Sequence, residues 1–235
     1  MSLDRVTFTG ADDSIDPIEL VRLSAEFPFV EWGILFSYKR QGSPRYPTYD
    51  WLRRLSDVVE PGTKLSAHLC GRWARDLVLM ADTAWFHEDL HCQYLFERIQ
   101  LNINSRVHGS DDGFKYVSDM YDEKQFILQC GGVNEEFPND MARLGLAVPL
   151  FDASGGAGRL PGEWPHAWPG VYCGYAGGLG PENIREQLVA IADAAGAERF
   201  WIDMERRVRS EDDHRFDLAK VRSVLEQIKD EVTSA

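Results

Sequence analysis

The sequence predicts an α/β fold, a single (β/α)8 TIM barrel that occupies residues 1–235 as one domain. Eight short β-rich segments begin 22 to 34 residues apart, which is a spacing typical of strand–helix units. Most of these segments are continuous apolar runs, as expected for strands that are buried on both faces. The length also fits one barrel of this kind, for which about 200 to 250 residues are usual.

The expected strands lie along the whole chain. In order, they are Arg5–Thr9, Val30–Phe36, Lys64–Cys70, Arg98–Asn102, Gln125–Gln129, Ala147–Asp152, Gly170–Tyr175 and Phe200–Met204. In such barrels the functional residues lie at the carboxyl ends of the strands. The candidates at those ends, which we expect to converge on a small polar ligand, are Thr9, Gly10, Asp12, His68, Cys70, Gln100, Asn102, Gln129, Cys130, Asp152, Tyr175, Gly177, Gly178, Asp203 and Glu205.

Helical patterns are clearest near the two ends of the chain. Asp16 and Pro17 resemble the capped start of a first helix. A later helix is expected to begin at Pro181 and to stop at Gly196, and an apolar stripe over residues 218–228 indicates a last helix.

The segments after the third, fourth and sixth strands are less regular. Residues 153–170 are rich in glycine and proline but include Trp164, His166 and Trp168, which favours an ordered functional loop over a flexible tether. We therefore expect eight strand–helix units in one domain, with the two termini close together at the bottom of the barrel.

Composition limits the classes of partner. The net charge of −13 argues against nucleic acid, which is bound by clustered basic residues. No apolar stretch approaches the roughly 18 residues of a membrane span and no leader opens the chain, so we expect a cytoplasmic protein, monomeric or homodimeric. Four cysteines without a paired C-x-x-C pattern are expected to be reduced, and neither a cofactor nor a metal is indicated. They are Cys70, Cys92, Cys130 and Cys173.

One strand-to-helix junction favours binding of a phosphorylated metabolite. Residues 174–184 read GYAGGLGPENI, an apolar run followed by a glycine turn and a proline. Backbone N–H groups at such a junction lack helical partners, and the helix dipole adds partial positive charge, so a phosphate is a suitable ligand. Arg206, Arg207 and Arg209 form a local basic cluster one strand later.

Several ordered motifs resemble the phosphoribosylanthranilate isomerase family, which catalyses an Amadori rearrangement in tryptophan biosynthesis. They are VTFTG at 6–10, SPRY at 43–46, IQLN at 99–102, LFDASGGAG at 150–158, YAGGLGPENI at 175–184 and FDLAKV at 216–221. The resemblance covers nearly the whole sequence. It implies the same barrel fold and an isomerase that acts on an aminoribose phosphate.

The resemblance also implies roles for individual residues. Asp152 would be the general acid that opens the ribose ring, and Arg45 would bind a carboxylate of the substrate. The other residues expected at the substrate are Gly155, Gly156, Gly177, Gly178 and Asp203, together with Arg206 as a basic residue near the phosphate.

Two departures from the family pattern put its reaction in doubt. Thr9 stands where the family has its catalytic cysteine, and a neutral hydroxyl is a much weaker base than a thiolate. Of the possible replacement bases (His68, Cys70, Asp12 and Cys130), His68 ranks first, because an imidazole needs the least pKa adjustment. After the last strand, Glu205 to Arg207 replace a small Ser-Ser-Gly turn. We therefore expect a sugar-phosphate isomerase with an altered substrate or base, poor on phosphoribosylanthranilate itself.

Three alternatives remain open at this stage. The first is a non-catalytic barrel that binds a phosphorylated metabolite and regulates or scaffolds a partner. The second is a metal-dependent enzyme whose ligands at the barrel mouth would be His68, Asp152, Asp203 and Glu205. The third is a zinc hydrolase, because His87 to His91 match H-E-x-x-H, although Asp89 places a charge where that motif normally faces the core.

Overall fold

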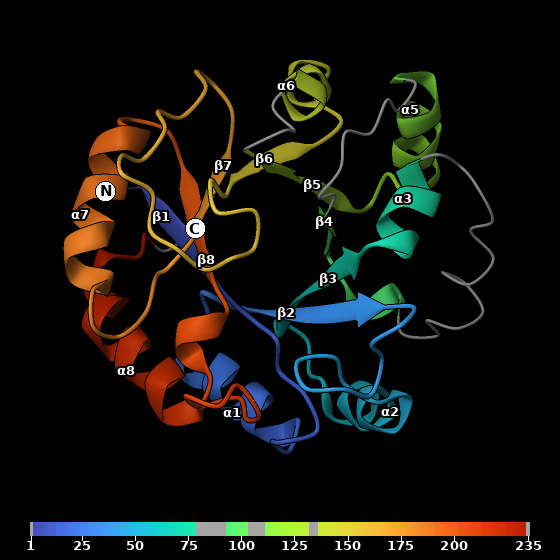
Figure 1. Cartoon of the computed structure of the whole chain (residues 1–235), viewed down its shortest axis with the longest axis vertical. Coiled ribbons are helices and arrows are strands. Elements are labelled where there is room, and N and C mark those ends of the chain that lie inside the picture. Colours follow the sequence, from blue (N-terminus) through green and yellow to red (C-terminus); the bar gives the residue numbers. More distant parts are fainter. Residues whose placement is uncertain (1, 79–92, 103–110, 132–135, 234–235) are drawn as a thin grey trace.

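The chain forms a closed parallel barrel in which each strand pairs with the next and β8 pairs with β1 (Figure 1). The computed structural model describes residues 2–78, 93–102, 111–131 and 136–233. The strands are β1 Leu3–Thr9, β2 Val30–Ser37, β3 Lys64–Cys70, β4 Arg98–Asn102, β5 Gln125–Cys130, β6 Val148–Phe151, β7 Cys173–Ala176 and β8 Phe200–Met204. The predicted fold class is thus confirmed, with strand boundaries within three residues of those expected.

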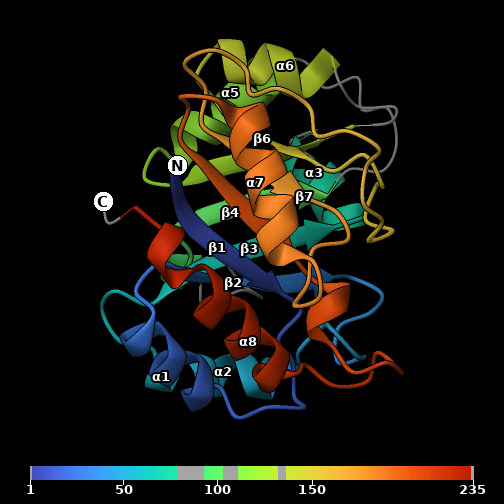
Figure 2. The same ribbon diagram turned by 90° about the vertical axis from the view of Figure 1, so that its left-hand side faces the viewer.

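Helices surround the barrel (Figures 1 and 2). They are α1 Ile18–Glu26, α2 Tyr49–Val58, α3 Arg72–Val78, α5 Asp111–Met120, α6 Glu136–Arg143, α7 Ile184–Ala195 and α8 Leu218–Ile228. Short 3₁₀ turns follow at Gln93–Leu95, Arg206–Val208 and Lys229–Glu231. Just before α1, Asp16 Oδ1 accepts a hydrogen bond from the Ile18 backbone N–H at 3.1 Å, and Pro17 is the residue at the N-cap.

One of the eight expected strand–helix units has no helix. Residues 152–172, between β6 and β7, are described throughout and form turns and extended chain. Glycines and prolines disfavour a helix there. The loop instead covers the barrel with aromatic side chains: Trp164 is 7% exposed and donates to Gln187 Oε1 at 3.0 Å, and the Trp168 ring packs edge-on against Phe151. This order agrees with the expectation that the loop is not a tether.

Two apolar clusters stabilise the barrel. The larger lies between strands and helices and includes Phe8, Trp32 and Phe36, which are fully buried. A smaller cluster fills the barrel's middle, where Trp201 lies directly over Gly174. A Cβ atom on Gly174 would fall 2.2 Å from the Trp201 ring, so only glycine leaves room for that indole.

A buried ion pair, which no sequence pattern predicted, lies below this apolar layer. Glu31 and Arg98 are at most 2% exposed, and their side chains meet at 3.1 Å. Arg5 binds the other Glu31 oxygen at 2.7 Å, while the Arg98 guanidinium lies 4.2 Å from the centre of the Trp201 ring. Burial alone would raise the pKa of Glu31, but the two guanidinium groups outweigh it and hold that pKa below its usual range.

The two ends of the chain lie together at the amino ends of the strands, as expected. Leu3 bridges in parallel to Val232, and the Thr233 N–H donates to the Leu3 carbonyl at 2.8 Å. Among the described residues, none of the helices has the length and apolar character needed to cross a membrane.

Candidate functional site

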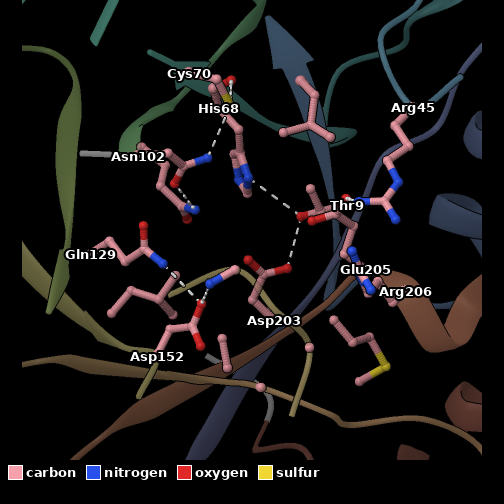
Figure 3. A pocket seen from close by; sticks show the side chains of 18 of the residues that line it. Thr9, Arg45, His68, Cys70, Asn102, Gln129, Asp152, Asp203, Glu205 and Arg206 are labelled. Carbon is pink, nitrogen blue, oxygen red and sulfur yellow. Dashed lines mark hydrogen bonds and ion pairs between the residues drawn. The ribbon is translucent and has the colours of Figure 1, made fainter. Parts of the chain in front are cut away.

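A polar pocket of about 300 Å³ opens at the carboxyl ends of the strands (Figure 3). Of the candidates selected from the sequence, it is lined by Thr9, His68, Cys70, Gln100, Asn102, Gln129, Asp152, Gly177, Gly178, Asp203 and Glu205. Residues 40, 45, 46, 155, 156, 158, 206 and 207 complete its rim, together with a few apolar side chains. The strand ends therefore converge as expected.

Four candidates lie elsewhere. Successive side chains of a strand point to opposite faces, so Cys130 and Tyr175 join the outer apolar cluster while Gln129 and Ala176 face the barrel interior. Gly10 and Asp12 belong to the loop after β1 and do not line the pocket. Closeness to a strand end in the sequence could not tell residues that face the pocket from those that face outward, because the next residue along a strand points to the opposite face.

Thr9, His68 and Asp203 form a hydrogen-bonded series on the pocket floor (Figure 3). Thr9 Oγ1 donates to Asp203 Oδ1 at 2.8 Å, and His68 Nδ1 lies 3.4 Å from the same hydroxyl. Because Thr9 gives its single proton to Asp203, its hydroxyl oxygen remains as the acceptor that faces His68 Nδ1. The series leaves Asp203 Oδ2 without a hydrogen bond from the described residues.

Gly33 makes this series possible, and the sequence analysis missed it. A Cβ on Gly33 would lie 2.3 Å from Thr9 Oγ1 and 2.7 Å from His68 Cε1. Any larger residue would therefore push the hydroxyl and the ring apart. A glycine inside an apolar strand, here VEWGILF, commonly marks such a close approach and was the available signal.

Burial changes the protonation of this series. It raises the pKa of Asp203 to about 8, although the Thr9 hydrogen bond lowers it. It lowers the pKa of His68 to about 3. At neutral pH the imidazole is therefore neutral and Asp203 is mostly protonated. His68 Nε2 is buried and has no partner in the described part of the chain.

Asp152 follows β6, lines the same pocket and is bound by four donors. Gln129 Nε2 and the Gly156 N–H reach Oδ2 at 2.9 and 2.7 Å. The Ser154 N–H and hydroxyl reach Oδ1 at 3.0 and 2.7 Å. This carboxylate therefore fixes the glycine loop after β6, and its lone pairs are largely engaged.

The glycines of the expected phosphate site fall into two groups in the described part of the chain, one with hydrogen-bonded backbone amides and one with free amides. The Gly155 and Gly156 amides donate to Asp152 within their own loop. The Gly177 and Gly178 amides, in contrast, make no hydrogen bond within the described residues and line the pocket. Helix α7 begins at Ile184 rather than at Pro181, so the helix start lies beyond the glycine turn.

Arg206 follows β8 and is a cation that remains available to bind an anionic ligand. It is exposed, lines the pocket and forms no ion pair within the described residues. Gly158 packs against its stem, since a Cβ there would lie 2.9 Å from Arg206 Cδ. Arg207 instead lies 3.7 Å from Glu182.

Arg45 is held by carboxylates. Its Nη1 donates to Glu205 Oε1 at 2.7 Å, and its Nε and Nη2 donate to Asp213 Oδ2, the former at 2.8 Å. Asp12 accepts the Arg45 backbone N–H at 2.7 Å and also pairs with buried Arg209 at 2.8 Å. The loops after β1, β2 and β8 are thereby joined into one rim.

The remaining wall is uncharged except for Arg40. Gln100 donates to Asn102 Oδ1 at 2.8 Å, and Asn102 donates to Cys70 Sγ at 3.3 Å. Arg40 lies over the Tyr46 ring at 4.6 Å. Each carboxamide keeps a further N–H, which suits hydroxyl and carbonyl groups of a ligand.

The metal hypotheses find no geometric support in the described residues, where no group of three or more His, Cys, Asp and Glu side chains is arranged to hold an ion. The H-E-x-x-H segment and Cys92 lie outside the described residues. The cysteines that are described, Cys70, Cys130 and Cys173, are not joined to one another by disulfides.

We expect Gly178→Val to weaken phosphate binding about tenfold or more. Gly178 has a φ of +67°, and a Cβ there would lie 2.5 Å from the Leu160 backbone nitrogen. The substitution should displace residues 159–160 and the adjacent amides, at some cost in stability. Calorimetry with inorganic phosphate and ribose 5-phosphate measures the effect. Gly162→Val, where a Cβ meets nothing within 4 Å, is the matched control. Unchanged affinity in Gly178→Val would remove this turn from the site.

Fold and pocket define the class of protein: a (β/α)8 barrel with a polar pocket at the carboxyl ends of its strands. Among solved structures it resembles phosphoribosyl anthranilate isomerase from Thermotoga maritima, with a TM-score of 0.61 and 15% identity over 97% of this chain and 100% of that one. The enzyme of the same name from Thermus thermophilus gives a TM-score of 0.63 and 16% identity over 96% of this chain and 98% of that one.

TrpF from Jonesia denitrificans matches equally well, with a TM-score of 0.63 and 16% identity over 96% of this chain and 97% of that one. No family model matches the sequence, and no curated protein matches it. At this level of identity, the likeness shows a fold like that of phosphoribosylanthranilate isomerase.

Proposed function

We propose that this barrel is a sugar-phosphate isomerase that interconverts an aldose and a ketose. The observation that carries the proposal is the series His68, Thr9 and Asp203 on a pocket floor, with the open amides of Gly177 and Gly178 in the same pocket. A buried carboxyl group beside an anion site is the minimum that a proton transfer on a phosphorylated sugar needs.

The phosphate end of the ligand is bound by the glycine turn. Free backbone N–H groups of Gly177 and Gly178 donate to phosphate oxygens, and Arg206 supplies a positive charge. The carboxamides of Gln100, Asn102 and Gln129 then face the hydroxyl groups of the sugar. The similar solved structures are named as enzymes of an aminoribose phosphate, which supports the same class of ligand for this chain.

Asp203 carries the proton. Its ionised form takes the proton from C2 of the open-chain aldose, which leaves an enediolate with its charge on O1. The O2 proton then moves to O1, and the neutral carboxyl group of Asp203 returns its proton to C1. Atoms and charge balance without any other reactant. A pKa of about 8 suits this role, because both forms of Asp203 exist near neutral pH.

Thr9 and His68 act on the ligand through Asp203. The Thr9 hydroxyl holds Oδ1, so that Oδ2 is left for the sugar, and the neutral His68 ring fixes the hydroxyl. This replaces the role first considered for His68, since its Nε2 is buried and its low pKa makes it a weak base. Asp152, considered as the acid from the resemblance, is assigned here to holding the glycine loop.

Proton exchange tests the proposal. Ribose 5-phosphate, glucose 6-phosphate and glucosamine 6-phosphate are incubated in D₂O, and NMR follows loss of the C2–H signal and appearance of the ketose. We expect protein-dependent exchange with at least one sugar, at a rate that rises as pH increases toward 8 and then levels off. Binding of these sugars without any exchange would instead show the non-catalytic binding protein that the sequence left open.

A further inference from the structure

Carboxylates in the surrounding rim neutralise the positive charge of the Arg45 guanidinium. Arg45 donates to Glu205 at 2.7 Å and makes a two-nitrogen contact with Asp213. Asp213 in turn also binds Arg209 at 2.8 Å. The Arg45 side chain is only 12% exposed, so a ligand meets this group with its charge already balanced by carboxylates.

Glu205 offers the pocket an acceptor. Its Oε1 takes the Arg45 hydrogen bond, whereas no hydrogen bond from the described residues reaches its Oε2. The side chain is 28% exposed and lines the pocket together with Asp203. Burial raises the pKa of Glu205 despite the nearby Arg45, so negative charge is already disfavoured at this position. A second anion here would be repelled, whereas an N–H or O–H group would be bound.

We propose that Glu205 selects the group of the ligand that meets the rim beside Arg45, accepting an amine or a hydroxyl there and rejecting a carboxylate. This specificity rests on the proposed function, because it presupposes a phosphate bound at Gly177 and Gly178. The substrate class is therefore a phosphorylated sugar or aminosugar with a neutral or cationic head. Arg45 contributes by holding Glu205 in place rather than by binding the ligand.

Arg40 is another guanidinium that lines the pocket, and it is a rival site for a carboxylate. It is exposed and lies over the Tyr46 ring at 4.6 Å. Because it forms no ion pair among the described residues, Arg40 rather than Arg45 would have to hold a carboxylate. Arg40→Met therefore belongs in the experiment.

Three ligands with the same six-carbon backbone and terminal phosphate test the proposal by calorimetry. Glucosamine 6-phosphate carries an amine on C2, glucose 6-phosphate a hydroxyl on C2 and 6-phosphogluconate a carboxylate at C1, so the three ligands differ in the part of the backbone away from the phosphate. Wild-type protein should bind 6-phosphogluconate about tenfold or more weakly than glucosamine 6-phosphate. In Glu205→Gln, which keeps an oxygen for Arg45, that ratio should collapse toward one.

The outcomes separate the two proposals. Wild-type protein that binds all three ligands alike, or prefers 6-phosphogluconate, overturns selection by Glu205, and loss of that preference in Arg40→Met would assign the carboxylate to Arg40. If Glu205→Gln keeps the wild-type ratio, Glu205 is likewise not the selecting residue. If none of the sugars binds and inorganic phosphate does not bind either, the proposed function itself fails. The discrimination by wild-type protein needs no variant, so the test survives poor folding of Glu205→Gln.

Discussion

Replacing Asp203 with asparagine should abolish proton exchange, lowering its rate by about 10² to 10⁴. The amide fits the same space and can still accept the Thr9 hydrogen bond, but it cannot take a proton from carbon. NMR exchange in D₂O measures the loss. Asp193→Asn, at an exposed site on α7, is the matched control and should leave exchange unchanged. Exchange at the wild-type rate in Asp203→Asn would assign the proton transfer to another group.

The same substitution should make the barrel more stable at high pH. Asp203 has a folded-state pKa of about 8, above the ordinary aspartate pKa of 3.8, so the folded state disfavours its ionised form. The sign follows from linkage: this group costs stability progressively as pH rises from about 4 to about 8, and the full penalty remains above that. Urea unfolding at pH 9 should therefore show Asp203→Asn more stable than wild type by a few kcal/mol. At pH 4 the two proteins should be nearly equal.

Arg98→Met should be the most destabilising change in the barrel interior, by about 3–5 kcal/mol. The substitution leaves Glu31, which is fully buried, with only Arg5 and Thr7 as partners. Urea unfolding at pH 7 measures the loss. Arg222→Met is the matched control, because Arg222 makes a two-nitrogen contact with Glu26 at the exposed surface, and its loss should cost far less stability than the loss of Arg98.

Removing both charges distinguishes a lost attraction from an unpaired buried charge. In Arg98→Met with Glu31→Leu, the uncompensated carboxylate is gone, so much of the stability should return. Arg98→Met alone should also lose less stability on acidification, because Glu31 owes its low pKa partly to Arg98 and that contribution vanishes as pH falls below about 4. An effect no larger than that of Arg222→Met would show that the buried pair adds little.

The sequence predicted which group of residues would share the candidate site. Polar residues at strand ends meet in any closed parallel barrel, so Thr9, His68, Asp152 and Asp203 were expected to share one pocket. Their partners were not foreseeable. The pairing of Arg45 with Glu205 joins positions 160 residues apart, and no local pattern encodes such a contact.

Local chemistry by itself determined the eight strands, the carboxyl end of α7, both ends of α8 and the closed barrel, because apolar runs, glycine stops and unit spacing depend on neighbours along the chain. Only the tertiary structure decided which carboxyl group is protonated, which amides are free and which guanidinium is neutralised. Those properties depend on burial and on contacts at distances of about 3 Å. Asp203 and Asp152 illustrate the difference: both end a strand, yet one is buried beside Thr9 with a raised pKa, and the other is bound by four donors.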